Sequence, residues 1–206
     1  MPRGRFQQQQ WEARQAAILT ALETLSAQCG FANVTMDDLA HEVGISKATL
    51  YQHFDSKDTM LVDLMATRAQ HFIDAVTSTA GQPPLDRLRC AMRHLLGEHI
   101  TPLRGMIQLG REEVLPVFHQ NEALLAQHVR TLDLLADVIV EGQAQGVIAA
   151  DLAPRTIVGA MWALSNVSIR TPMSHDPAPP LDVEQLIILF ERGIRPPVEG
   201  SDPDHD

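Results

Sequence analysis

Hydrogen-bonding side chains gather in one stretch of this 206-residue sequence, TMDDLAHEVGISKATLYQHFDSK, which runs from Thr35 to Lys57. Both lysines of the chain, Lys47 and Lys57, and its single tyrosine, Tyr51, fall inside this stretch. Ammonium, hydroxyl and amide groups of this kind donate hydrogen bonds to phosphate oxygens and to the edges of nucleic-acid bases. The stretch is therefore the first candidate for a binding site.

Spacing separates an apolar face from a polar one in the second half of the stretch. Ile45, Leu50 and Phe54 recur at helical intervals and are expected to point into a core. The opposite face of the same helix then presents two pairs of residues four apart, which are Lys47 with Tyr51 and Ala48 with Gln52. One helix can thus be held by a core and still offer a polar surface to a partner.

The residues of this polar face suit particular parts of a DNA duplex. An amide such as Gln52 can bind an adenine edge, Lys47 can reach a guanine or a phosphate, and the small Ala48 would allow close approach. Thr49, Tyr51 and His53 carry donors suited to phosphate oxygens. Thr35 and Lys57 stand where flanking helices begin, and helix starts also favour phosphate.

Plainer interpretations of these residues remain open. Tyr51 could be a core aromatic like Phe54, and the two lysines could be ordinary solvated side chains. Near the N-terminus, Arg3 and Arg5 are compatible equally with a basic arm that enters a minor groove and with a disordered tail.

Capping and turn residues predict the elements that position this face. Thr35 can cap a helix with Asp38 reaching back to it, Gly44 ends that helix, and Ser46 caps the next. Two short helices joined by a glycine-containing turn form a helix-turn-helix. We expect a helix over about residues 8–28 before them, and another from Asp55 or Ser56 to about residue 79 after them.

The whole chain is predicted to be all-α, with about nine helices. Aromatic residues make up only 4% of the chain, and apolar residues recur at three and four rather than at two. Further helices are expected at about 85–99, 102–113, 119–145, 154–170 and 181–193. We predict a three-helix head at 1–56, a larger ligand-binding and dimerisation domain at 57–195 and a disordered tail at 196–206.

Composition bounds the class of protein. The formal net charge is −10, of which residues 1–60 contribute −2 and the remainder −8, so the acidity lies mostly outside the predicted head. The sequence predicts no membrane span and no secretory signal, which favours a cytoplasmic protein. Cys29 and Cys90 are expected to be buried thiols in a reducing compartment.

The segment from about Ile18 to Leu64 resembles the DNA-binding head of the tetracycline-repressor (TetR) family. The shared features are the Gly30-Phe31 exit of the first helix, the start at Thr35, the turn from Gly44 to Ser46, the Leu50-Tyr51-x-x-Phe54 run and the Ser56-Lys57 start. The resemblance implies an Ω-shaped homodimer whose C-terminal domain binds a ligand that moves the two heads apart. It also implies phosphate contacts from Thr35, Tyr51, His53 and Lys57.

The C-terminal two thirds resembles that family in layout only. Broad apolar faces and small residues at 154–170 and 181–193 predict a four-helix interface between two copies. Large apolar side chains are weak candidates for lining an effector cavity, although core packing is the default for each; they are Met92, Met106, Phe118, Met161 and Trp162. The nine histidines match no standard metal spacing, so neither metal nor other cofactor is expected.

These observations together predict a regulator of transcription. We expect a repressor that leaves a pseudo-palindromic operator in double-stranded DNA when a small-molecule effector binds. The alternative is a helical-bundle enzyme or ligand carrier with a vestigial head. The sequence contains no recognisable nucleophile–base pair or phosphate loop to support the enzyme.

Overall fold

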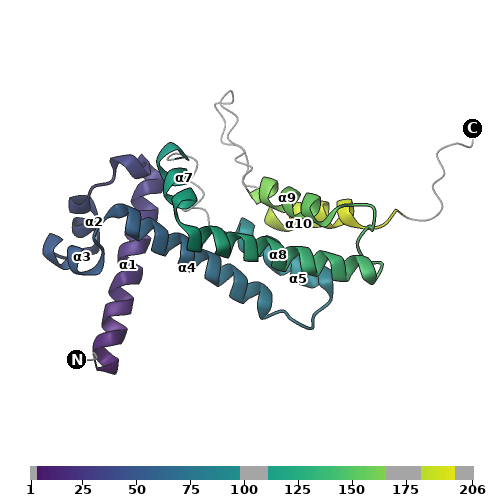
Figure 1. The fold of residues 1–206 in the computed structure, drawn as a ribbon, viewed down its shortest axis with the longest axis horizontal. Coiled ribbons are helices and arrows are strands. Elements are labelled where there is room, and N and C mark those ends of the chain that lie inside the picture. Colours follow the sequence, from purple (N-terminus) through teal and green to yellow (C-terminus); the bar gives the residue numbers. More distant parts are fainter. Residues whose placement is uncertain (1–3, 98–110, 166–181, 198–206) are drawn as a thin grey trace, which may run out of the picture. The chain divides into compact units, whose positions relative to one another are not determined.

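A computed structural model of the protein describes residues 4–97, 111–165 and 182–197, and these form nine α-helices, one short 3-10 helix and no strand. The all-α prediction is therefore confirmed for the described residues (Figure 1). The helices are α1 (Arg5–Cys29), η1 (Phe31–Asn33), α2 (Met36–Val43), α3 (Lys47–His53), α4 (Lys57–Thr77), α5 (Pro84–Leu96), α7 (Arg111–Gln120), α8 (Glu122–Ala144), α9 (Pro154–Ser165) and α10 (Val183–Ile194).

The chain divides into two compact units. Unit 1 comprises residues 1–71 and 98–128, and unit 2 comprises residues 72–97 and 129–206. The division falls within α4 and within α8, so unit 1 holds more than the head predicted at residues 1–56. That functional boundary remains a prediction.

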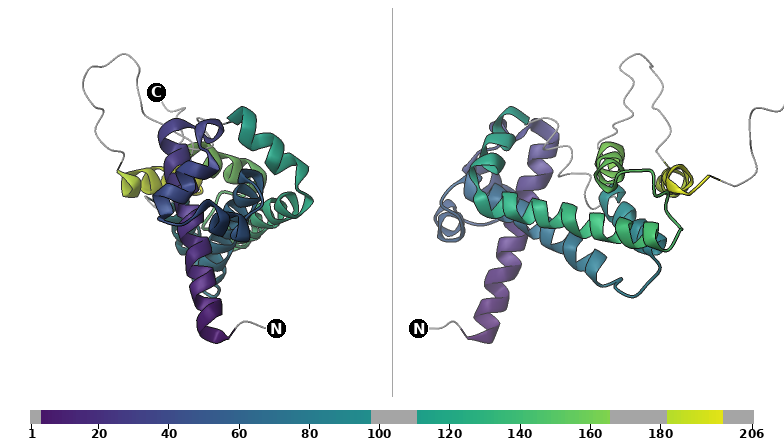
Figure 2. Two further views of the ribbon diagram at one scale, coloured as in Figure 1. Left: turned by 90° about the vertical axis from the view of Figure 1, so that its left-hand side faces the viewer. Right: turned by 45° about the vertical axis from the view of Figure 1, so that its right-hand side comes forward.

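Unit 1 is built around α1, whose buried residues Ile18 and Leu22 contact the helix-turn-helix. Leu39 of α2 and Leu50 of α3 are fully buried in the same core. Val114 of α7 also belongs to this core and is fully buried, and Figure 2 shows α7 beside the other helices of unit 1. A helix far along the chain thus completes the core of the unit that contains the helix-turn-helix.

A buried ion pair joins α1 to α4 inside unit 1. Glu23 is only 2% exposed and accepts a hydrogen bond from the guanidinium of Arg68. Removing one member of such a pair leaves the other charge buried without compensation, which typically costs several kcal/mol. The pair therefore fixes α4 to α1.

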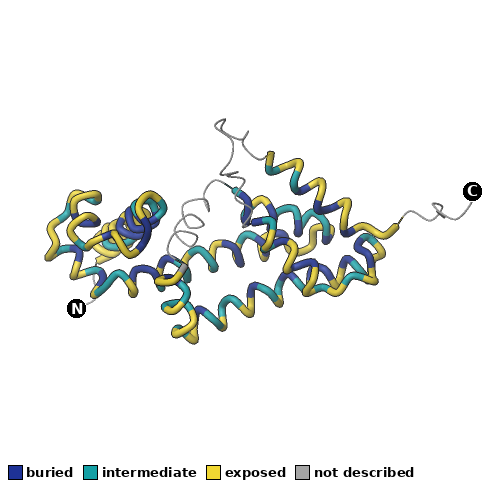
Figure 3. Tube along the Cα trace, turned by 90° about the horizontal axis from the view of Figure 1, so that it is seen from above, coloured by how far each residue is buried: buried dark blue, intermediate teal, exposed yellow. Residues whose placement is uncertain are grey.

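Unit 2 packs α5, α8, α9 and α10 around one apolar core. Its fully or almost fully buried side chains include Leu88, Leu135, Ile139, Met161 and Ile187. Figure 3 shows buried and exposed positions alternating along the helices, as amphipathic helices require.

Ion pairs also hold α10 against α5 in unit 2. The guanidinium of Arg93 binds both carboxylate oxygens of Glu184, at 2.7 and 2.8 Å. That of Arg89 lies 2.9 Å from the carboxylate of Glu191.

Several predicted helix boundaries need correction. The first helix begins at Arg5 rather than near residue 8, and the helix predicted over 119–145 is two helices that part at Asn121. The side-chain oxygen of Asn121 accepts a hydrogen bond from the backbone N–H of Leu124 at 3.0 Å, so it caps the start of α8. Most of the helix predicted at 102–113, residues 166–170 and residues 198–206 of the predicted tail lie outside the described residues.

Cysteine burial also differs from the prediction. Both thiols are free, but Cys29 is exposed at the end of α1 and Cys90 is only half-buried. Among the helices that the structure describes, none combines the length and apolarity that crossing a bilayer requires.

Candidate nucleic-acid interface

The first helix of the helix-turn-helix is fixed by a reciprocal cap. The Thr35 hydroxyl accepts a hydrogen bond from the backbone N–H of Asp38 at 3.2 Å, and the Asp38 carboxylate accepts one from the backbone N–H of Thr35 at 2.9 Å. The Thr35 hydroxyl also donates to that carboxylate at 2.6 Å. These hydrogen bonds, led by the one from the hydroxyl, lower the pKa of Asp38 below its ordinary value of 3.8.

The turn between α2 and α3 depends on one glycine. Gly44 has φ of +71°, in the left-handed region where a side chain would be strained. The backbone N–H of Ile45 then donates to the carbonyl of Ala40 at 2.9 Å. Ser46 follows as the cap of α3, where its side chain accepts a hydrogen bond from the backbone N–H of Thr49 at 3.0 Å. The predicted turn and both predicted caps are present.

The third helix has the two faces that the spacing predicts. Leu50 is fully buried and Phe54 is 4% exposed, whereas Tyr51 is 45% exposed. The remaining members of the polar face, which are Lys47, Ala48 and Gln52, are all exposed. The side of α3 away from the core therefore presents an ammonium group, a phenol and an amide, with a small residue among them.

Lys47 is held in place by an acidic neighbour on α2. Its ammonium group lies 2.9 Å from the carboxylate of Asp37, and this hydrogen bond raises the pKa of Lys47. Both side chains are at least half exposed, so the pair is screened by water. The ammonium group stays positively charged and accessible, although a phosphate would compete with Asp37 for it.

Lys57 has a structural contact that the sequence did not reveal. Its ammonium group donates to the backbone carbonyls of Phe31 at 2.8 Å and Ala32 at 3.3 Å, and it lies 4.8 Å from the centre of the Phe31 ring. Lys57 thus ties the start of α4 to η1. A phosphate contact from Lys57, which the resemblance implies, would be made in addition to this role or by exchange of partners.

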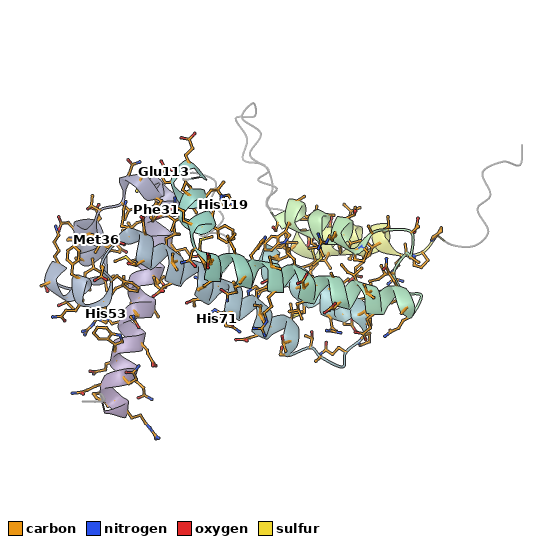
Figure 4. The ribbon with its side chains drawn as sticks, in the orientation of Figure 1. Phe31, Met36, His53, His71, Glu113 and His119 are labelled. Atoms are coloured by element: carbon orange, nitrogen blue, oxygen red, sulfur yellow. The ribbon has the colours of Figure 1, made fainter. Side chains whose placement is uncertain are left out.

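His53, the last residue of α3, is covered by the N-terminal part of α1. Its ring, labelled in Figure 4, stacks on the indole of Trp11, with centroids 3.6 Å apart and planes inclined by 25°. No sequence motif marks Trp11, but its helical spacing does. It lies four and seven residues before Gln15 and Ile18, and so on the core-facing side of α1.

The remaining hydroxyl candidates are engaged locally. The hydroxyl oxygens of Thr49 and Ser46 lie 2.8 Å apart, and the Thr35 hydroxyl serves the cap described above. Five of the predicted contact residues thus have partners within the head, and they are Thr35, Ser46, Thr49, His53 and Lys57. Their contacts with DNA remain predictions.

The weak candidates for an effector cavity are only partly brought together. Met92 and Met161 are fully buried in the core of unit 2, and Trp162 packs against the same cluster. Phe118 lies in unit 1, where its ring contacts His119 and His128 edge-on with centroids 5.7 Å apart in each pair. Met106 lies outside the described residues. In the part of the chain that is described, no three His, Cys, Asp or Glu side chains are grouped closely enough to hold a metal ion.

Comparison with known proteins gives matches over the helix-turn-helix region and over most of the chain. The model of bacterial regulatory proteins of the tetR family matches residues 18–64, which contain the helix-turn-helix. The HTH-type transcriptional regulator TcmR of Streptomyces glaucescens is 26% identical over 191 residues, covering 88% of this chain and 80% of the relative. The HTH-type transcriptional repressor KstR2 of Mycolicibacterium smegmatis is 26% identical over 186 residues, covering 84% of this chain and 85% of KstR2.

The fold is also that of solved regulators. The crystal structure of AibR in complex with isovaleryl coenzyme A and operator DNA superposes with a TM-score of 0.62 at 22% identity, covering 89% of this chain and 99% of AibR. These matches agree with the structure, in which a capped helix-turn-helix presents one buried and one exposed face of α3. Residues 18–64 thus match the model of bacterial regulatory proteins of the tetR family, and the chain is similar to transcriptional regulators over most of its length.

Proposed function

We propose that the protein is a sequence-specific DNA-binding regulator of transcription that places α3 in the major groove. The observation that supports this most strongly is the outward face of α3, where exposed Lys47, Tyr51 and Gln52 stand opposite the buried Leu50 and Phe54. A helix of this kind, held by its apolar side, is how helix-turn-helix proteins present donors to base edges.

The proposed regulator acts as a homodimer through α9 and α10. On α10, Ile188 and Leu189 are 47% and 65% exposed, and both line an open surface pocket. On α9 the exposed residues include Gly159, Ala160 and Ala163, which are small enough to let another helix approach closely. A two-fold dimer carries two copies of α3 and therefore requires an operator with two inverted half-sites.

A small-molecule effector releases this dimer from its operator in the proposed mechanism. Because an effector shifts a two-state equilibrium only by its differential affinity, it must bind the DNA-free arrangement of the dimer more tightly. AibR, a structural neighbour solved in complex with isovaleryl coenzyme A and operator DNA, supports a regulator that binds a small molecule, and the relative KstR2, named a transcriptional repressor, supports repression. The proposed activity is binding without catalysis, and it takes place in the cytoplasm where operator DNA lies.

The proposal is tested by selecting binding sites from random duplex DNA with the purified protein. We expect enrichment of an inverted repeat by the wild type and loss of that enrichment by the double variant Lys47→Ala/Tyr51→Ala. Both side chains are exposed, so the double variant should keep the melting temperature of the wild type.

Arg130→Ala supplies the matched control. It removes one exposed basic group from α8, in unit 2, and should leave the selected sequence unchanged. If folded, ligand-free wild type enriches no sequence at low salt, the proposal is wrong, and a carrier or enzyme with a vestigial head becomes the better account.

A further inference from the structure

The first helix extends beyond the part of the chain that matches the family. It starts at Arg5, whereas the family match starts at Ile18. We call residues 5–17 of α1 the arm. The arm is therefore a feature of this chain for which the match to residues 18–64 gives no role.

The arm is attached to the end of the DNA-facing helix. Trp11 stacks on His53 at a centroid distance of 3.6 Å, and both residues are half-buried. Offset or parallel ring contacts of this kind add about 1 kcal/mol to the apolar burial, so the stack holds the two elements together. The arm consequently lies beside the last turn of α3.

The composition of the arm favours a polyanion. It has two arginines, Arg5 and Arg14, against a single glutamate, although the whole chain has a net charge of −10. Glutamines occupy positions 7–10 and are exposed, so they add amide donors. The one acidic side chain, Glu12, accepts a hydrogen bond from the amide of Gln8 at 2.8 Å.

Helical spacing directs part of this polar surface to the same side as Trp11. Gln7 lies four residues before Trp11 and Arg14 lies three residues after it, so both share its face of α1. Arg14 is exposed. The guanidinium group is thus carried by the side of the arm that adjoins α3.

We propose that the arm contacts phosphates of the DNA duplex next to the bases that α3 faces, with Arg14 as the main contact and Trp11 as the residue that positions it. This inference rests on the proposed function, because the arm adjoins α3 and carries the opposite charge to DNA. Trp11 acts through His53, which it holds at the end of α3. The arm then enlarges the duplex surface that each head covers without adding a base contact.

The salt dependence of operator affinity tests the role of Arg14. Each phosphate contact contributes about 0.9 to the slope of log affinity against log salt concentration. On the selected operator, Arg14→Gln should lower the slope by about one per bound protomer and weaken binding about fivefold per protomer at physiological salt. Arg130→Gln removes the same charge from α8 and should change neither quantity.

Phosphate-ethylation interference tests the position of the contact. The wild type should show phosphates whose ethylation blocks binding, and Arg14→Gln should lose a subset of them while the selected base sequence stays the same. Trp11→Ala should lose the same subset, and Trp11→Phe, which keeps an aromatic ring over His53, should retain it. Gln9→Ala changes the opposite face of the arm and serves as a control.

The outcomes separate this inference from the proposed function. If the wild type selects an inverted repeat but Arg14→Gln matches Arg130→Gln in slope and interference pattern, the arm makes no phosphate contact and the inference is overturned. If the wild type binds no DNA, the proposed function itself fails. If Trp11→Ala does not fold by circular dichroism, Arg14→Gln and Trp11→Phe still decide the question.

Discussion

At the scale of single residues, the two lysines of the chain differ in the groups that their ammonium groups contact. The Lys47 ammonium group pairs with an exposed carboxylate, whereas that of Lys57 donates to two backbone carbonyls and lies over the Phe31 ring. A lysine that ties two elements together contributes to stability, and a lysine in a screened surface pair contributes little.

Lys57→Met should therefore destabilise the protein, and Lys47→Met should not. Loss of the carbonyl hydrogen bonds and the contact with the ring predicts a decrease of about 1–2 kcal/mol in the free energy of unfolding for Lys57→Met. Urea denaturation followed by circular dichroism measures it. Equal urea midpoints for the two variants would show that the contact of Lys57 with η1 does not contribute to stability.

The sequence predicts the exposure or contacts of a side chain only where its partners are close in the chain. The exposure of Tyr51 and the burial of Phe54 follow from spacing within one helix. The partners of Lys57 and Trp11 are distant in sequence and depend on how α1, η1 and α3 pack together. No local pattern reveals such contacts.

At the scale of elements, the cap of α2 makes the stability of the protein depend on pH. The Asp38 carboxylate is stabilised in the folded state by its hydrogen bonds to Thr35, so its pKa is lowered by folding. A lowered pKa contributes stability that is fully present above the unfolded value and is lost as pH falls through the folded value.

The difference in free energy of unfolding between the wild type and Asp38→Asn should therefore be constant above about pH 5 and should shrink as pH falls below the ordinary value of 3.8. Urea denaturation at a series of pH values measures this difference. In a Thr35→Val background, which lacks the hydroxyl, most of the pH-dependent part should disappear. A difference that stays constant from neutral pH to pH 3 would contradict the effect of the cap on the Asp38 carboxylate.

Helix ends with local caps are predictable, and helix partners are not. Thr35, Gly44 and Ser46 define α2 and α3 from the sequence because each acts on the backbone within a few residues. Asn121 caps α8 in the same way, but it lies within a long apolar repeat that is typical of one continuous helix. Val114 belongs to the core of unit 1, and only tertiary packing decides that.

At the scale of the whole molecule, the proposed homodimer depends on the outward face of α10. Leu189→Asp places a charge on this face and should convert a dimer into a monomer, because an unpaired charge in an apolar interface is strongly unfavourable. Val140→Asp is the matched control, since Val140 is similarly apolar and 52% exposed but lies on α8.

Sedimentation equilibrium measures the molar mass of both variants in solution. We expect a monomer for Leu189→Asp and a dimer for Val140→Asp. A dimer in both cases would place the interface elsewhere on the chain.

The central claim is that α3 contacts the bases of the operator, and the sequence preference of Gln52→Ala tests it most directly. The side chain of Gln52 is exposed on the polar face of α3 and can bind an adenine edge, so its removal should relax selection at one base pair in each half-site. Sites selected from random duplex DNA by the variant should keep every other preference, and affinity for the wild-type operator should fall by about 1–3 kcal/mol per half-site. An unchanged preference at every position of the operator would contradict the placement of α3 against the bases.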